Sequence, residues 1–270
     1  RELNTDVSLR VEDTDTTECF KVSGRGELHL SVLIENMRRE GYEFAVSKAE
    51  VLYHTDENGK KTEPMEMAYV DVPDEFTGTV IDKLSQRKGE LRNMGMSNGG
   101  YTRLEFSIPS RGLIGYRGEF MTDTKGNGII NTIFNGYAPY KGDIPGRTRG
   151  SLVAFEQGET TGYGIYTLQD RGTMFIGPNE QVYEGMIVGE NSRENDIDIN
   201  PCKKNVSNMR TSSSDEAIRL TPPRILSLEQ AIEYINSDEL VEVTPEHIRL
   251  RKAILDRTIR GRNAKNARKG

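Results

Sequence analysis

Residues 101–109 read YTRLEFSIP, and this stretch decides how the central part of the chain folds. The side chains alternate along it, as they do in a strand that buries one face and exposes the other. One face carries Thr102, Leu104, Phe106 and Ile108, and the other carries Arg103, Glu105 and Ser107. The pattern therefore predicts a half-buried strand whose even-numbered side chains point into a core.

Five further elements surround this strand. Before it come a strand ended by Pro73, a helix that Asp74 caps and Gly89 stops, and a strand at residues 90–96 joined to it by the glycine-rich turn 97–100. After it come one helix and a last strand. Their apolar side chains are Leu113, Ile114, Tyr116, Phe120 and Met121, then Ile129, Ile130, Ile133 and Phe134. The order βαββαβ predicts a ferredoxin-like domain over residues 65–143.

The first 64 residues repeat part of this pattern. Two short strands, a helix stopped by Gly41 and a strand running from Phe44 to about Tyr53 give the order ββαβ, and residues 56–64 form a polar linker or hairpin tip. This order is the central unit without its first strand and first helix. We expect a truncated domain of the same fold in tandem with the next, in a chain cut from a longer protein.

The pattern of apolar residues and glycines changes after Tyr140. Short β-rich runs at residues 152–155, 163–168 and 182–189 alternate with glycines. A helix begins at Ser227, where Gln230 completes a capping box, and two more short strands follow. Residues 144–270 are therefore predicted to form a β-rich domain with a helix, and the whole chain belongs to the α+β class.

The composition limits the classes of protein to which this chain can belong. The chain has 270 residues, a formal net charge of -6 and two cysteines. No apolar run approaches the roughly 20 residues of a membrane span. Two cysteines cannot form a disulfide framework, so we expect a reducing, cytoplasmic environment. We also expect a monomer that does not contact membranes.

Catalytic motifs are weak. Residues 95–99 match the G-x-S-x-G pattern, but strands flank it on both sides, so a hairpin turn is the better interpretation. Asp196, Asp198 and Asn200 imitate part of a calcium loop, yet Pro201 stands where glycine is required. The three histidines lack metal or triad spacing, and no phosphate loop is present. We expect no catalytic residues, no metal site, no bound cofactor and no enzyme activity in this chain.

Cationic stretches carry the stronger functional signal. Lys203, Lys204 and Arg210 lie in residues 200–214, a polar run without an acid. Cations among small polar side chains suit contacts to phosphate and sugar oxygens, although a solvated loop would look similar. The basic C-terminal tail is the alternative RNA-binding element, because it contains Arg257, Arg260 and Arg262 and few acidic residues.

Four motifs carry a resemblance to a known family. They are SGRGELHL at residues 23–30, IPSRGLIG at 108–115, LQDRG at 168–172 and ELVEVTP at 239–245. The chain resembles the ribosome-dependent translational GTPases related to elongation factor G, and within them it is similar to the BipA (TypA) branch over essentially its whole length.

The resemblance implies a parent protein whose GTP- and Mg-binding domain precedes this chain. Residues 1–64 are similar to part of the third domain, 65–143 to the fifth, and 144–270 to the C-terminal domain of the branch. Expected partners are the ribosome, with its rRNA and proteins, and A-site tRNA, and expected roles are ribosome assembly and stress adaptation. The exposed RNA-facing loop of the branch corresponds to Lys203, Lys204, Asn205 and Arg210.

Two classes of function remain open. The chain is either a ribosome-binding module of a translational GTPase or a free-standing ligand- or protein-binding module of tandem ferredoxin-like domains that binds no RNA. Salt-sensitive association with ribosomes distinguishes the two, because only contacts to phosphates release counterions.

Overall fold

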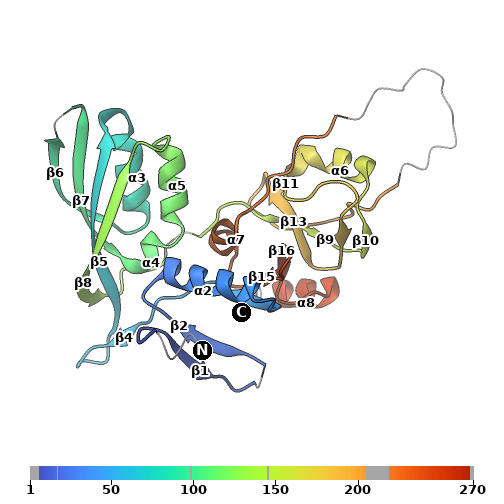
Figure 1. Ribbon diagram of the computed structural model, residues 1–270, viewed down its shortest axis with the longest axis horizontal. Helices are drawn as coiled ribbons and strands as arrows, with labels where there is room; N and C mark the ends of the chain where they lie inside the picture. The colour runs from blue at the N-terminus through green and yellow to red at the C-terminus, as the bar shows by residue number, and fades with distance from the viewer. Residues whose placement is uncertain (1–5, 17, 98, 145, 205–218, 268–270) are drawn as a thin grey trace. The chain divides into compact units, whose positions relative to one another are not determined.

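The computed structural model describes residues 6–16, 18–97, 99–144, 146–204 and 219–267. The chain forms two compact units. Residues 49–146 form the first, called here the insert unit; residues 1–48 and 147–270 together form the second, called the composite unit (Figure 1). The chain therefore passes between the units twice. The predicted division into three domains, at 64/65 and 143/144, is a finer one and stays a prediction.

An antiparallel sheet organises the insert unit. Its main strands lie in the spatial order β8-β5-β7-β6, and the short β4 pairs with the first two residues of β5. The strands are β4 (His54–Thr55), β5 (Lys61–Pro73), β6 (Glu90–Ser97), β7 (Tyr101–Pro109) and β8 (Ile129–Pro139). The helical segments are η1 (Asp74–Phe76), α3 (Thr77–Gln86), α4 (Ser110–Leu113) and α5 (Tyr116–Asp123). Along the chain these elements follow the predicted βαββαβ order.

One face of this sheet carries the core. Leu104, Phe106 and Ile108 have no solvent exposure, which confirms the alternation predicted for β7. They pack with Tyr116 and Phe120 of α5 and with side chains of α3 in one apolar cluster. Figure 1 shows α3 and α5 next to each other on the same side of the sheet. The helices cover this face because both present their apolar stripes to it.

Two local predictions for the insert unit are wrong. The single helix after Pro109 is two helices, because Ile114 is extended and Gly115 takes a φ of 72°, and Met121 is 45% exposed. Asp74 does not cap a helix but accepts a hydrogen bond from Thr102. Helix α3 does end before Gly89, and Lys88 is the left-handed residue between them, with a φ of 66°.

The composite unit is built from both ends of the chain. Its N-terminal part contains β1 (Arg10–Asp13), β2 (Phe20–Ser23), α2 (Glu27–Arg39) and β3 (Phe44–Ser47). β1 and β2 pair only with each other in the described residues, whereas β3 pairs with β15 of the C-terminal part. The predicted truncated ferredoxin-like sheet for residues 1–64 is therefore wrong, as is the extension of β3 to Tyr53. Strand pairing across about 200 residues overrides the local ββαβ pattern.

The larger sheet of this unit has seven strands. Its path is β14-β9-β13-β16-β15-β3, and β11 also pairs with β13. These strands are β9 (Ser151–Ala154), β11 (Gly172–Met174), β13 (Met186–Asn191), β14 (Ile197–Ile199), β15 (Glu239–Val243) and β16 (Ile248–Lys252). A second pair is β10 (Gly158–Glu159) with β12 (Gln181–Val182). The remaining helical segments are α6 (Gly162–Leu168), η2 (Gln169–Arg171), α7 (Leu228–Tyr234) and α8 (Arg257–Ala267).

The helices of this unit test two predictions. For α7, both hydrogen bonds of the capping box between Ser227 and Gln230 are present, which confirms the prediction. The predicted strand at residues 163–168 is instead helix α6, which starts where the Thr161 side chain accepts a hydrogen bond from the Gly164 N–H. Tyr163 and Ile165 favour strands, but the Thr161 cap and the packing of α6 on the core decide the local structure.

A buried ionic cluster lies at the start of β15. Glu239 has no solvent exposure and receives hydrogen bonds from Arg147, Ser151 and Lys252. Burial alone would raise the pKa of Glu239, but the hydrogen bonds and charges of Arg147 and Lys252 outweigh it and hold the pKa below its ordinary value.

Replacing Phe106 with Ala should lower the free energy of unfolding of the insert unit by about 3 to 5 kcal/mol, because a fully buried aromatic side chain is lost. The control is Glu105→Ala on the opposite face of β7, which should cost about 0.5 kcal/mol or less. Denaturant melts measure both. A loss under about 1 kcal/mol for Phe106→Ala would contradict the assigned core face.

The stability of the composite unit should decrease as the pH falls below about 4.5, the ordinary pKa of a glutamate. Glu239 has a lowered pKa when folded, so the unfolded chain binds more protons in this range. Glu239→Gln should make the pH dependence shallower by up to about 1.4 kcal/mol per pH unit. Melts at a series of pH values measure the slopes, with the exposed Glu246→Gln as the control. Equal slopes for wild type and Glu239→Gln would exclude this linkage.

Candidate nucleic-acid interface

Lys203 and Lys204 lie just after β14, and both side chains are exposed. Among the described residues, no ion pair involves either ammonium group. The backbone that leads to them is firmly held. Asn200 accepts a hydrogen bond from the Cys202 N–H at 2.9 Å and donates one to Glu156 at 2.6 Å. The first cations of the predicted RNA-binding loop are therefore presented by an ordered segment.

The N-terminus of α6 holds this segment in place. Thr161 donates its backbone N–H to Pro201 O at 3.1 Å and its hydroxyl to Lys203 O at 2.6 Å. Gly164 makes the approach possible, because a Cβ at this position would lie 2.1 Å from Pro201 O. A side chain at Gly164 would collide with backbone, which cannot move aside as a flexible side chain can.

The other end of α6 holds the chain where its described part resumes. Gln169 donates its side-chain amide to Arg219 O at 3.4 Å and accepts from the Thr221 N–H at 3.1 Å. Leu220, between these two residues, packs against the apolar core of the unit. One short helical segment, α6 with η2, thus contacts the chain on both sides of residues 205–218. Asn205 and Arg210, the other predicted RNA contacts of this loop, lie outside the described residues.

Helix α8 carries the predicted basic tail, and two of its arginines have partners inside the protein. Asp198 of β14 accepts from Arg257 Nε at 3.0 Å and from Arg260 Nη2 at 2.7 Å. Arg257 also lies over the ring of Phe155, with 5.0 Å from Cζ to the centroid. These side chains fasten α8 to the sheet, so they are less available to a nucleic acid than the sequence suggests.

The following turns of α8 differ from its start. Arg262 and Lys265 are exposed, and neither forms an ion pair with another described residue. The structure therefore divides the predicted RNA-binding residues into two groups. Arg257 and Arg260 anchor the helix, whereas Lys203, Lys204 and Arg262 face solvent and can meet a phosphate without breaking an internal contact.

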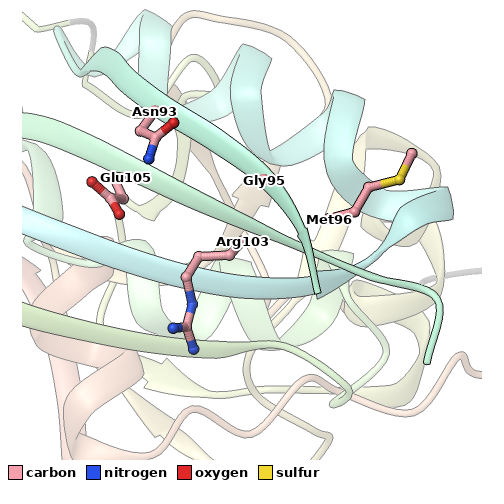
Figure 2. Close-up of a pocket in the computed structure, with 5 residues that line it drawn as sticks. All are labelled: Asn93, Gly95, Met96, Arg103 and Glu105. Atoms are coloured by element: carbon pink, nitrogen blue, oxygen red, sulfur yellow. The ribbon is translucent and has the colours of Figure 1, made fainter. Parts of the chain in front are cut away.

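The insert unit has a shallow hollow on the open face of its sheet, lined by Asn93, Gly95, Met96, Arg103 and Glu105 (Figure 2). Arg103 is held in two hydrogen bonds to Asp71, each of 2.8 Å, on the neighbouring strand. The hollow brings together no nucleophile and base. Within the described part of the chain, no three His, Cys, Asp or Glu side chains gather as metal ligands would, and none of its helices could cross a bilayer.

Sequence reasoning missed the residues that shape this interface. In the sequence Thr161 stands out in no motif, Gln169 belongs only to the LQDRG motif, and Asp198 matches only an incomplete calcium loop. One local signal was available, because threonine is a favoured N-cap residue and Thr161 directly precedes the segment 162–168. The pairing of Asp198 with Arg257 joins residues 59 positions apart, and no local pattern reports it.

Comparison with known proteins now adds a second line of evidence. Residues 60–148 match the elongation factor G C-terminus, and residues 149–257 match the TypA/BipA C-terminal domain. Proteins named "Large ribosomal subunit assembly factor BipA" are similar to nearly the whole chain. The chain is similar to the C-terminal part of BipA proteins.

Three BipA relatives show the extent of the match. The protein from Synechocystis sp. is 51% identical over 93% of this chain, that from Bacillus subtilis is 50% identical over 98%, and that from Haemophilus influenzae is 52% identical over 97%. The chain spans only 42% to 43% of the length of these relatives. The boundary between the two matched segments, at 148/149, lies close to the second passage between the units.

Replacing Gly164 with Ala should destabilise the composite unit by about 1 to 3 kcal/mol, because the new methyl group meets the Pro201 carbonyl. Gly162→Ala is the matched control, since a Cβ there meets nothing within 4 Å and Ala favours the helix. Denaturant melts give the two free energies, and amide hydrogen exchange at Thr161 reports the bond to Pro201. Similar effects for both variants would show that the close approach of α6 to Pro201 is not needed.

Proposed function

We propose that this chain is the ribosome-binding part of a BipA-type large ribosomal subunit assembly factor, and that it binds RNA through the composite unit. The names of the relatives support association with the large ribosomal subunit. The observation that carries RNA binding is the exposure of Lys203, Lys204 and Arg262 without internal partners among the described residues. Because the net charge is -6, attraction to RNA depends on such local cations.

The loop that begins at Lys203 and helix α8 bind different parts of the RNA. Lys203 and Lys204 begin the loop that includes Asn205 and Arg210, and we assign this loop to A-site tRNA and nearby rRNA. Arg262 lies on α8, which we assign to the phosphate backbone of rRNA. Arg257 and Arg260 contribute mainly by fastening α8 to Asp198.

The chain supplies contacts rather than chemistry. We propose that GTP and Mg bind in another part of the full-length protein, which acts as a translational GTPase in the cytoplasm, in ribosome assembly and stress adaptation. The chain itself is proposed to be monomeric and to contact ribosomal proteins as well as RNA. The β8-β5-β7-β6 order supports a ferredoxin-like classification of the insert unit, as in elongation factor G.

A module of these domains that binds a protein or small ligand but no RNA is the alternative. The open sheet face of the insert unit favours it, because Ile129 and Ile133 are more than half exposed there. Such surfaces commonly meet another protein. Binding through this apolar face would depend weakly on salt, whereas binding through cations would depend strongly on it.

The double variant Lys203→Ala/Lys204→Ala should weaken binding of the chain to large ribosomal subunits. The slope of log affinity against log salt should become shallower by about one to two units, because up to two phosphate contacts are lost. The melting temperature should stay nearly unchanged, since both side chains are exposed. Sedimentation with subunits over a range of salt concentrations measures affinity and slope.

The matched control is Lys60→Ala/Arg117→Ala, which removes the same charge from exposed positions of the insert unit. A parallel variant, Arg262→Ala/Lys265→Ala, tests α8. If the loop variant keeps wild-type affinity and slope while the α8 variant loses both, α8 is the main RNA contact. If neither variant changes the slope, the RNA-binding proposal is wrong and the alternative is favoured.

A further inference from the structure

The end of strand β13 brings together arginines from separate parts of the chain. The last residues of β13 lie between β9 and β11, because Glu190 pairs with the first residue of β9 and the second residue of β11 (Figure 1). Both neighbours run antiparallel to β13, so the residues that precede them lie beyond its end. Arg149 shortly precedes β9, Arg171 directly precedes β11, and Arg193 shortly follows β13.

Backbone hydrogen bonds hold these three segments against one another. The Ser192 N–H donates to Arg171 O, and the Gly150 N–H donates to Arg193 O, each at 2.8 Å. Gly172 allows the close approach of β11, because a Cβ there would lie 1.9 Å from a backbone oxygen of β13. The LQDRG motif therefore fixes the place of its arginine at the end of the sheet.

The side chains of this region are exposed, and one carboxylate joins two of them. Arg149 Nη1 lies 3.0 Å from one oxygen of Glu190, and Arg224 Nη1 lies 3.7 Å from the other. The side chains of these two arginines are still 60% and 51% exposed. Arg171 and Arg193 are exposed as well, and neither forms an ion pair with another described residue.

Positive charge is in excess at this place. We call Arg149, Arg171, Arg193 and Arg224 the arginine cluster. Its acidic neighbours are Glu190, Asp170 and Glu194, and among the described residues only Glu190 pairs with any member of the cluster. The chain as a whole has a net charge of -6, so the arginine cluster is a local attraction for polyanions on a negative background.

The chemistry of arginine indicates the kind of polyanion. A guanidinium group has five N–H donors in a planar fork that matches a phosphate group, so an arginine that contacts Glu190 keeps donors for a second partner. A small phosphorylated molecule needs a concave pocket, whereas these side chains are more than half exposed where Arg149 and Arg224 were measured. An extended backbone with many phosphates suits such an open surface.

We propose that the arginine cluster binds the phosphate backbone of RNA, at a site made of other residues than the loop at Lys203 and helix α8. The choice of RNA as the polyanion rests on the proposed function, while the site itself rests on the contacts at the end of β13. Neither the composition of the loop nor that of the tail predicts it, because its arginines are spread over about 75 residues and only the sheet brings them together.

The double variant Arg171→Ala/Arg193→Ala tests the site in the full 270-residue chain. It should bind isolated large-subunit rRNA less tightly, and the slope of log affinity against log salt should become shallower by about one to two units. The melting temperature should stay nearly unchanged, because both side chains are exposed. Filter binding over a range of salt concentrations measures affinity and slope.

Two further variants separate phosphate recognition from a general loss of charge. Arg171→Lys/Arg193→Lys keeps the charge but lacks the planar fork, so the slope should stay at the wild-type value while the affinity falls. Glu194→Gln removes an exposed acid beside Arg193 and should raise the affinity about twofold, whereas Glu246→Gln, at an exposed turn of the same unit, should change it less.

The outcomes distinguish this site from the proposed function. A wild-type slope in Arg171→Ala/Arg193→Ala, beside a shallower slope in Lys203→Ala/Lys204→Ala, would overturn the arginine site and leave the proposed function intact. If the wild-type chain binds rRNA without salt dependence, both are wrong. Poly-glutamate is the probe for an acidic protein. If the wild-type chain binds it more tightly than rRNA and the double arginine variant does not, the cluster meets a protein and its assignment to RNA is wrong.

Discussion

A carboxylate with no access to water lies at the first residue of β15, and the composite unit is arranged to neutralise it. Glu239 contacts Arg147, Ser151 and Lys252, which come from two separate parts of the chain, residues 147–151 and the end of β16. A buried charge without partners would cost several kcal/mol, so these residues must lie together whenever the unit is folded. The cluster therefore fixes the registration of β9, β15 and β16 and the point at which the second passage arrives.

Local sequence patterns predicted the elements whose stability comes from their own residues. The alternation in β7, the βαββαβ order of the insert unit and the Ser227 capping box of α7 all appear in the structure. Each is encoded within a few neighbouring residues. The pairing of β3 with β15 and the bond between Glu63 and Arg111 are not, because they depend on which distant segments meet. Tertiary contacts also decided that residues 162–168 are helical.

At the candidate interface, too, the sequence predicts some features, and contacts between distant residues decide the others. Composition alone singled out Lys203 and Lys204, and the structure places both in solvent. Composition also grouped Arg257 with Arg262, although only the first is bound to Asp198. A count of cations cannot separate anchoring arginines from solvent-facing ones, since the distinction depends on an acid 59 residues away. The positions of Thr161 and Gln169 beside the loop were likewise beyond any pattern in the sequence.

The pairing of β3 with β15 has a practical consequence for shorter versions of this chain. β15 is interior to the seven-stranded sheet only because β3 lies along its outer side. A polypeptide that begins at residue 49 would lose β3 and leave the backbone N–H and C=O groups on that side of β15 unpaired. Exposed strand edges recruit strands from other molecules. The isolated C-terminal domain would therefore tend to self-associate in solution, and a soluble version would need residues 44–47 supplied by a linker or as a separate peptide.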